Sequence, residues 1–196
     1  INMLVVALEH LDQSEGIGNQ ISYASKLFLS RKNWKCIGSG ANYNFAKNSA
    51  KKLIKELRRA CAFDVLENHK HIDMSAEAAI FVFIAGIWKH GYQEDAISEI
   101  KKILAHNSLP IIVTDSSDHR FDAYSIDIEN SSGEIKQMTV PIIKLPRVAL
   151  QYAYPLNVLL LTKITAAMKI ILNFDGTSLP QKIAVVTSNP ELANAN

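Results

Sequence analysis

Hydrophobic residues follow two periods along this chain. In some segments they form short continuous runs, which are typical of buried strands, and in others they recur every three or four positions, which is typical of amphipathic helices. The runs predict strands at 34–40, 61–66, 79–86, 110–114, 124–128 and 137–145, and the periodic segments predict helices at 3–12, 21–29, 42–59, 94–106 and 147–173. Because strands and helices alternate, we expect a three-layer α/β/α sandwich with a mainly parallel, flavodoxin-like sheet.

Glycine and proline residues set the expected element boundaries. Gly16 and Gly18 are expected to separate the first two helices, and Pro155 predicts a kink or a break in the last one. The tripeptide 131–133 predicts a hairpin tip, after which 137–145 returns as one edge strand. The polar segment 115–118 follows a buried strand, at the end where open α/β sheets bind ligands.

The length of 196 residues is enough for one domain with its own core. We expect two leading helices within 1–33 and a single α/β domain over 34–196, which ends in a long helix and a tail. In the tail, the apolar run 183–186 is expected to dock, and the last residues are expected to be mobile. Because the first residue is Ile rather than Met, the chain is interpreted as a fragment of a larger protein.

Composition narrows the possible partners and compartment. Hydrophobic residues make up 48% and charged residues 20%, with a net charge of +2 and no basic block, so we expect no nucleic-acid binding. The most apolar segment, 156–174, is interrupted by Asn157, Lys163 and Lys169, so no membrane span is expected. Both cysteines, Cys36 and Cys61, fall in predicted strands and are interpreted as buried reduced thiols of a cytoplasmic protein.

A glycine turn joins the first predicted strand to the helix at 42–59. Gly38, Ser39 and Gly40 would place free backbone N–H groups at the positive end of a helix dipole, which suits an anion such as a phosphate. Glycine permits a positive φ and close backbone approach, and the Ser39 hydroxyl could also bond a phosphate. The same sequence also fits a purely structural turn, because any tight strand-to-helix connection accommodates glycine. Both interpretations stay open at this point.

The helix at 42–59 and the loop after the next strand carry the remaining candidate chemistry. The helix has a strongly charged face, which fits a solvated surface. Within it, Lys52 and Glu56 are four residues apart, as in an ion pair or two groups that share a pocket. His69 and His71 could act as general acid or base near neutral pH, or be plain loop residues. Their spacing makes a poor metal site, so no metal and no cofactor is expected.

Several segments together resemble a known family. The stretch 37–46, Ile-Gly-Ser-Gly-Ala-Asn-Tyr-Asn-Phe-Ala, resembles the G-x-G-x-x-Y-x-x-A opening of a sugar isomerase (SIS) domain. More narrowly it resembles the C-terminal SIS lobe of the isomerizing glucosamine-fructose-6-phosphate aminotransferases. The segment 50–57 resembles the A-L-K-L-K-E-I helix of that family, Lys70-His71 its K-H-G-P loop, and 146–148 with 154–156 its P-H-V…V-P-L segment.

The resemblance implies a phosphosugar ligand and an amino-sugar reaction. It implies that Glu56 is the base moving a proton between C1 and C2 of fructose 6-phosphate, in an enzyme that acts on fructose 6-phosphate or glucosamine 6-phosphate. It further implies that Lys52 assists, that His71 helps to open the sugar ring, and that Gly38, Ser39, Gly40 and Asn42 bind substrate. The N-terminal SIS lobe and the glutaminase domain of such an enzyme have no counterpart in this sequence. Independently of the resemblance, a homodimer is expected, because the long apolar helix at 156–174 would otherwise leave a sizeable apolar face exposed.

The sequence also departs from the pattern of that family. Without a gap, the catalytic glutamate position falls on Lys55, and Glu56 matches it only after a shift of one residue. Ile72-Asp73 replaces the G-P pair, and Ala184 stands at the position of the C-terminal lysine. These departures favour an alternative, a non-catalytic SIS module for sugar-phosphate sensing or dimerisation. A flavodoxin-like nucleotide binder is disfavoured because the sequence has no phosphate loop of that kind.

Overall fold

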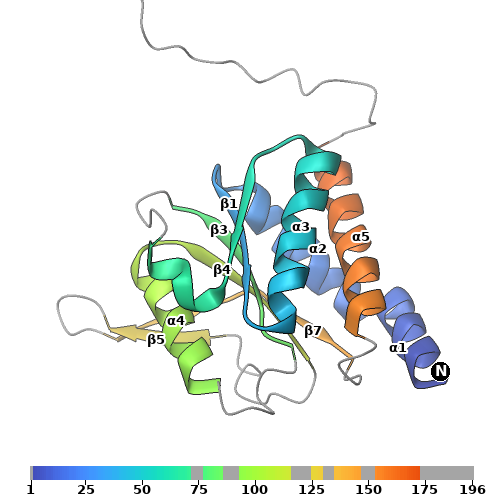
Figure 1. Cartoon of the computed structure of the whole chain (residues 1–196), viewed down its shortest axis with the longest axis horizontal. Helices are drawn as coiled ribbons and strands as arrows, with labels where there is room; N and C mark the ends of the chain where they lie inside the picture. The colour runs from blue at the N-terminus through green and yellow to red at the C-terminus, as the bar shows by residue number, and fades with distance from the viewer. Residues whose placement is uncertain are drawn as a thin grey trace, which may run out of the picture.

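A computed structural model describes residues 2–71, 77–85, 93–115, 125–129, 135–146 and 153–172. Its centre is a five-stranded sheet in the order β2-β1-β3-β4-β7, and every neighbouring pair in it is parallel (Figure 1). The strands are β1 Trp34–Gly38, β2 Cys61–Asp64, β3 Ala79–Phe83, β4 Leu109–Asp115 and β7 Ile142–Leu145. The expected α/β architecture with a parallel sheet is confirmed.

Helices cover both faces of this sheet. One face carries α2 Glu15–Leu29, α3 Ala41–Leu57 and α5 Ala153–Ile171, with α1 Asn2–Gln13 packed at the side of α5 (Figure 1). The other face carries α4 Gln93–Ala105 and the short 3₁₀ helix η1 Leu66–His71. Each side has its own apolar cluster, because the fully buried strands β1 and β3 send alternate side chains to opposite faces.

The two leading helices are part of the core. Ala7 and Leu11 of α1 and Ile21 and Phe28 of α2 belong to the same buried cluster as the first strand. The break between these helices is at Ser14, whose hydroxyl accepts a hydrogen bond from the Ile17 N–H at 3.4 Å. The expected break at 16–18 is therefore wrong, because the N-cap at Ser14 starts α2 and both glycines are accommodated inside it.

The predicted edge strand at 137–145 is two strands. Its first part belongs to β6 Ile135–Thr139, which pairs antiparallel with β5 Ser125–Glu129 in a separate two-stranded sheet. Its second part is β7, which joins β4 in the main sheet after Pro141. The Pro141 carbonyl accepts a bond from the Ile112 N–H at 2.9 Å, so the chain turns there from one sheet to the other. The expected hairpin tip at 131–133 lies outside the described residues.

The described part of the last helix runs from Ala153 to Ile171. Because α5 begins at Ala153, Pro155 lies in its first turn, where a missing N–H breaks no helical bond, and so Pro155 does not interrupt the helix as expected. Three other predictions lie outside the described residues: the helical start at 147–152, the polar loop at 116–118 and the tail at 173–196.

The two cysteine side chains lie next to each other beneath α3. Cys36 and Cys61 are free and buried, with 3.7 Å between their Sγ atoms. Burial, followed by the contact with Cys61, raises the pKa of the Cys36 thiol. The expected buried thiols are thus confirmed. No helix among the described residues is long and apolar enough to cross a membrane.

Candidate functional site

The turn between β1 and α3 needs both of its glycines for structural reasons. A β-carbon at Gly38 would lie 2.7 Å from the backbone oxygen of Asn42, so only glycine lets α3 approach the strand this closely. Gly40 has a φ of +57° and a ψ of −124°, a conformation that side chains with a β-carbon rarely adopt. The glycine pattern is therefore explained by packing and backbone conformation before any ligand is considered.

Polar groups at the turn remain available for an anion. The Ser39 Oγ is buried and has no hydrogen-bond partner among the described residues. The Asn42 and Tyr43 N–H groups bond to the carbonyls of Ser39 and Gly40, at 3.0 and 3.1 Å, and the described chain provides no partner for the N–H groups of Gly40 and Ala41. A buried hydroxyl beside free N–H groups at a helix N-terminus is a suitable anion site.

The position of the turn in the sheet also favours ligand binding. From β1 the chain moves outward to β2 and then returns to the other side of β1 as β3, so β1 and β3 flank the point where the strand order reverses. Open α/β sheets bind ligands in the crevice outside the carboxyl ends of the strands at this point. Gly38 at the end of β1 pairs with Phe83 at the end of β3.

Asn42 links the turn to the neighbouring strand. Its side chain is buried, and its Nδ2 donates to the carbonyl oxygen of Ala85, just after β3, at 3.1 Å. This bond holds the first turn of α3 against the end of β3. The amide therefore has a structural role in addition to the substrate contact predicted for it.

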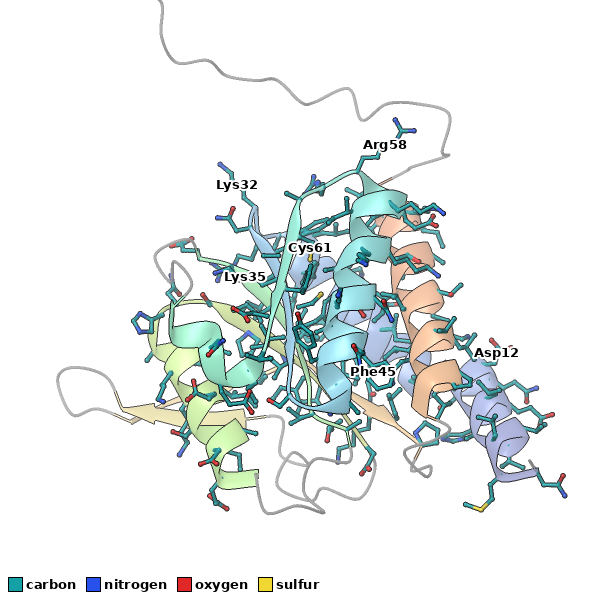
Figure 2. All side chains as sticks on the ribbon, viewed as in Figure 1. Asp12, Lys32, Lys35, Phe45, Arg58 and Cys61 are labelled. Carbon is teal, nitrogen blue, oxygen red and sulfur yellow. The ribbon has the colours of Figure 1, made fainter. Side chains whose placement is uncertain are left out.

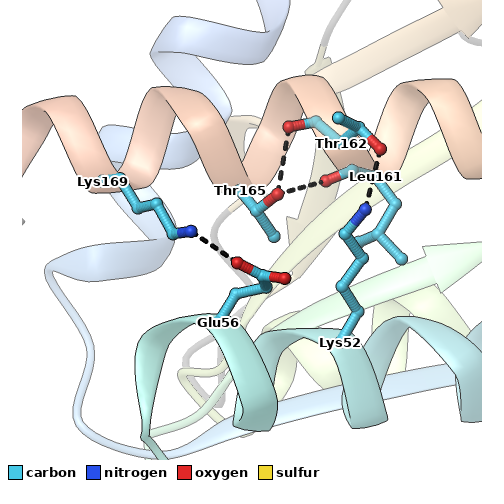
Figure 3. Close-up of polar contacts among 6 residues, drawn as sticks. All are labelled: Lys52, Glu56, Leu161, Thr162, Thr165 and Lys169. Atoms are coloured by element: carbon cyan, nitrogen blue, oxygen red, sulfur yellow. Dashed lines mark hydrogen bonds and ion pairs between the residues drawn. The ribbon is translucent and has the colours of Figure 1, made fainter. Parts of the chain in front are cut away.

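Lys52 and Glu56 lie far from the turn and contact α5. The Lys52 Nζ donates to the Thr162 Oγ1 at 2.7 Å, and Glu56 forms an ion pair with Lys169 (Figure 3). With a rise of 1.5 Å per residue, Glu56 lies about 22 Å along the helix from Ala41, and Lys52 about 16 Å. Within this chain the structure thus brings Lys52 and Glu56 into contact with α5. It does not bring them to the glycine turn.

The ion pair also sets the protonation of Glu56. The hydrogen bond from Lys169 is the main cause that holds the pKa of the Glu56 carboxyl below its usual range, and Lys52 and Lys55 add to it. A carboxylate with a lowered pKa is a weak base, whereas general-base glutamates are usually tuned upward. Lys55, the other residue considered for this position, is exposed on the outer surface of α3.

The other candidates are only partly described. The backbone of His71 ends η1, on the opposite face of the sheet from α3, and the side chains of His69 and His71 lie outside the described residues. Among the described residues, no group of three His, Cys, Asp or Glu side chains is arranged to hold a metal ion.

Two residues at these contacts, and one polar residue of β4, were not predicted from the sequence. Thr162 and Lys169 meet α3 from a helix more than 100 residues later, and no local pattern predicts that pairing. Thr114 is fully buried near the carboxyl end of β4, and its Oγ1 has no hydrogen-bond partner among the described residues. A hydroxyl at the end of the apolar run 110–114 was the signal for Thr114.

No protein-family profile matches this chain, and no curated protein matches its sequence. Solved structures match its fold. The C-terminal domain of glucosamine-fructose-6-phosphate aminotransferase from Francisella tularensis superposes with a TM-score of 0.62 at 14% identity, over 86% of this chain and 42% of that one. Tagatose-6-phosphate ketose/aldose isomerase from Escherichia coli gives a TM-score of 0.53 at 8% identity, over 86% of this chain and 44% of that one.

A third match is similar in length to this chain. The sugar isomerase domain of the RpiR transcription factor from Sphaerobacter thermophilus gives a TM-score of 0.53 at 11% identity, over 85% of this chain and 94% of that domain. The chain therefore has the fold of sugar isomerase (SIS) domains. It spans less than half of the two enzyme structures and nearly all of the domain from the transcription factor.

Proposed function

We propose that this chain is a phosphosugar-binding SIS module whose ligand phosphate is held at the turn between β1 and α3. The observation that carries the proposal is the buried Ser39 hydroxyl, which has no protein partner among the described residues and lies beside free N–H groups at the start of α3. The position at the switch point of the sheet and the SIS fold support it.

Calorimetric titration with fructose 6-phosphate and glucosamine 6-phosphate tests the proposal. We expect saturable binding to the wild-type chain and its loss in Ser39→Glu, because a carboxylate at this position repels the phosphate. Ser14→Ala, which removes another hydroxyl at a helix start, serves as the matched control and should bind normally. Binding that Ser39→Glu retains, or no binding by the folded wild type, would contradict the proposal.

The enzymatic version of this function is a second proposal, and it rests on the sequence resemblance. In it, the chain belongs to an isomerizing aminotransferase-like enzyme of amino-sugar metabolism, with Glu56 as base, Lys52 assisting and His71 opening the ring. A second SIS lobe and a glutaminase domain would complete the site. The structurally similar aminotransferase domain supports the need for a second lobe, because this chain matches only 42% of its length.

Within this chain the contacts favour the non-catalytic module. Lys52 and Glu56 are both engaged by α5, and the lowered pKa of Glu56 suits an inter-helix contact better than proton abstraction. Because the buried thiols are reduced, we also propose a cytoplasmic location. Turnover of fructose 6-phosphate by the whole enzyme separates the two versions, since Glu56→Gln should abolish it only if Glu56 is the base.

We further propose that the chain forms a homodimer through α1. The buried apolar side chains of α5 pack within the chain, and the exposed ones, Val158, Ile170 and Ile171, lie toward its two ends, so α5 does not present the continuous apolar face that its sequence suggests. Instead α1 exposes Met3, Val5 and Val6, and grooves of about 370 and 640 Å³ flank it. Light scattering should give a dimer mass that falls to a monomer in Val6→Glu, whereas a monomeric wild type would contradict this.

A further inference from the structure

A ridge of positive charge runs along the outer surface of α3. Lys47, Lys51, Lys55 and Arg58 follow one another at steps of three or four residues, so they lie on one line about 16 Å long. None of the four forms an ion pair with another residue in the part of the chain that the structure describes. We call these four residues the basic ridge. Figure 2 shows Arg58 at its end, pointing away from the body of the protein.

The ridge concentrates the positive charge of the protein in one segment. Residues 41–59 contain six of the 21 Lys and Arg residues but only one of the 19 Asp and Glu residues, namely Glu56. The rest of the chain therefore has 15 basic and 18 acidic residues, a formal charge of −3, although the whole chain carries +2. The single acid faces α5 and is paired with Lys169, so it does not neutralise the ridge. Such asymmetry attracts an anionic partner to this surface.

The ridge lies beside an open edge of the sheet. β2 is the outermost strand, and β1 is its only neighbour among the described strands. The Lys47 Nζ lies 6.0 Å from the centre of the Phe63 ring in β2, which joins the two features into one surface. Phe63 is 38% exposed, and Ile54, on the flank of α3, is 43% exposed. This surface thus combines outer backbone groups of β2 that no described strand pairs with, apolar side chains and uncompensated cations.

We propose that this surface binds an extended acidic peptide segment of a partner protein, which adds to β2 as a further strand. A strand edge presents both N–H donors and C=O acceptors, and a peptide backbone satisfies both kinds. Phosphate groups of a nucleic acid or a lipid only accept hydrogen bonds and would leave the carbonyls unpaired. On the face toward α3, apolar side chains of the segment would cover Phe63 and Ile54, and acidic ones would meet the basic ridge.

The cations also explain why the partner must be acidic. Lysine beside a sheet edge keeps identical copies of a protein from pairing edge to edge, because like charges repel. The same lysines attract an acidic segment. The edge therefore disfavours pairing with another copy of this chain and favours an acidic partner.

The test uses a synthetic peptide of about ten residues that alternates Glu and Val, a length that exceeds the four residues of β2. Fluorescence anisotropy should show saturable binding that weakens as salt rises from about 50 to about 300 mM. Lys47→Glu/Lys51→Glu should lower the affinity about tenfold or more. Lys101→Glu/Lys102→Glu makes the same change of charge on α4, on the other face of the sheet, and should bind nearly as well as the wild type.

Hydrogen exchange then decides whether a strand is added. On peptide binding, amides of β2 should become protected from exchange, whereas amides of the opposite edge strand, β7, should not change. Three results would overturn the proposal: no binding of the acidic peptide, equal weakening by the α4 variant, or binding without protection of β2. Tighter binding of an oligothymidylate of similar charge or of phosphatidylserine vesicles would overturn it too, because the partner would then be a phosphate polymer or a membrane.

Discussion

The two ends of α3 differ in how completely their polar groups are satisfied. At the N-terminal end, the Ser39 hydroxyl lacks a partner among the described residues, and Gly40 adopts a backbone conformation that few residues tolerate. At the C-terminal end, Lys52 and Glu56 both have partners on α5. Satisfied contacts hold a structure together, while an unsatisfied buried group carries a cost that a ligand can remove. This difference supports our proposal that the ligand site lies at the beginning of the helix, with a structural contact at its end.

The largest expected effect is a loss of stability from a substitution at the N-terminal end of α3. Gly38→Ala should lower the free energy of unfolding by about 1–3 kcal/mol, because the added β-carbon would meet the backbone of Asn42 rather than a flexible side chain. Urea unfolding measures this. Gly18→Ala is the matched control: nothing lies within 4 Å of its β-carbon, so it should stabilise α2 by about 0.5–1 kcal/mol. Equal effects of the two variants would show that close packing does not require Gly38.

A second variant separates backbone strain from packing at the same end. Gly40→Ala has open space around its β-carbon, so only the positive φ opposes it, at a cost of about 1–2 kcal/mol. Thermal unfolding gives the change. If this variant is as stable as the wild type, the turn has another conformation than the one described.

The ion pair at the other end should contribute less. Glu56 and Lys169 are 31% and 33% exposed, so Glu56→Gln should cost at most about 1 kcal/mol. Because the folded-state pKa of Glu56 is lowered, its contribution is present above the ordinary carboxyl pKa of about 4.3 and is lost as pH falls through the folded value. Stability measured from neutral to acid pH should therefore show the two proteins converging at low pH. A difference that is independent of pH would contradict the ion pair.

The smallest expected effect is a gain at the C-cap of α3. Arg58 has a left-handed conformation, with a φ of 53°, at a position where helices usually have glycine. Arg58→Gly should raise stability by about 0.5 kcal/mol, since the relief of strain slightly exceeds the entropy lost by glycine. Chemical unfolding measures the change. Arg59→Gly is the control, because Arg59 does not have a positive φ. Destabilisation by Arg58→Gly alone would mean that the arginine side chain stabilises the helix end.

Most of this fold was predictable from local sequence patterns, because helix and strand periodicity depends on residues close together in the sequence. The periodic apolar positions of α3 and the continuous run of β3 reflect which faces are buried, so both were found with boundaries correct to within a few residues. The split between β6 and β7 was missed, because a single apolar-rich stretch contains no sign of which sheet each half joins. The start of α2 was predicted too late, because Gly16 and Gly18 were interpreted as a break and Ser14 was not recognised as the N-cap.

The candidate site was predictable only in part. The glycine turn was visible in sequence because its conformation demands particular residues at adjacent positions. The partners of Lys52 and Glu56 were not, because Thr162 and Lys169 come from a distant helix whose packing no local pattern determines. The roles of Glu56, His71 and Lys52 in catalysis stay predictions from resemblance.

Titration of the isotopically labelled chain with fructose 6-phosphate, followed by NMR amide shifts, tests the central claim most directly. We expect saturable shifts of the Gly40 and Ala41 amides, with the amides around Lys52 and Glu56 nearly unchanged. Shifts confined to the end of α3 near α5, with Gly40 and Ala41 unaffected, would contradict it and place the ligand at the paired residues instead.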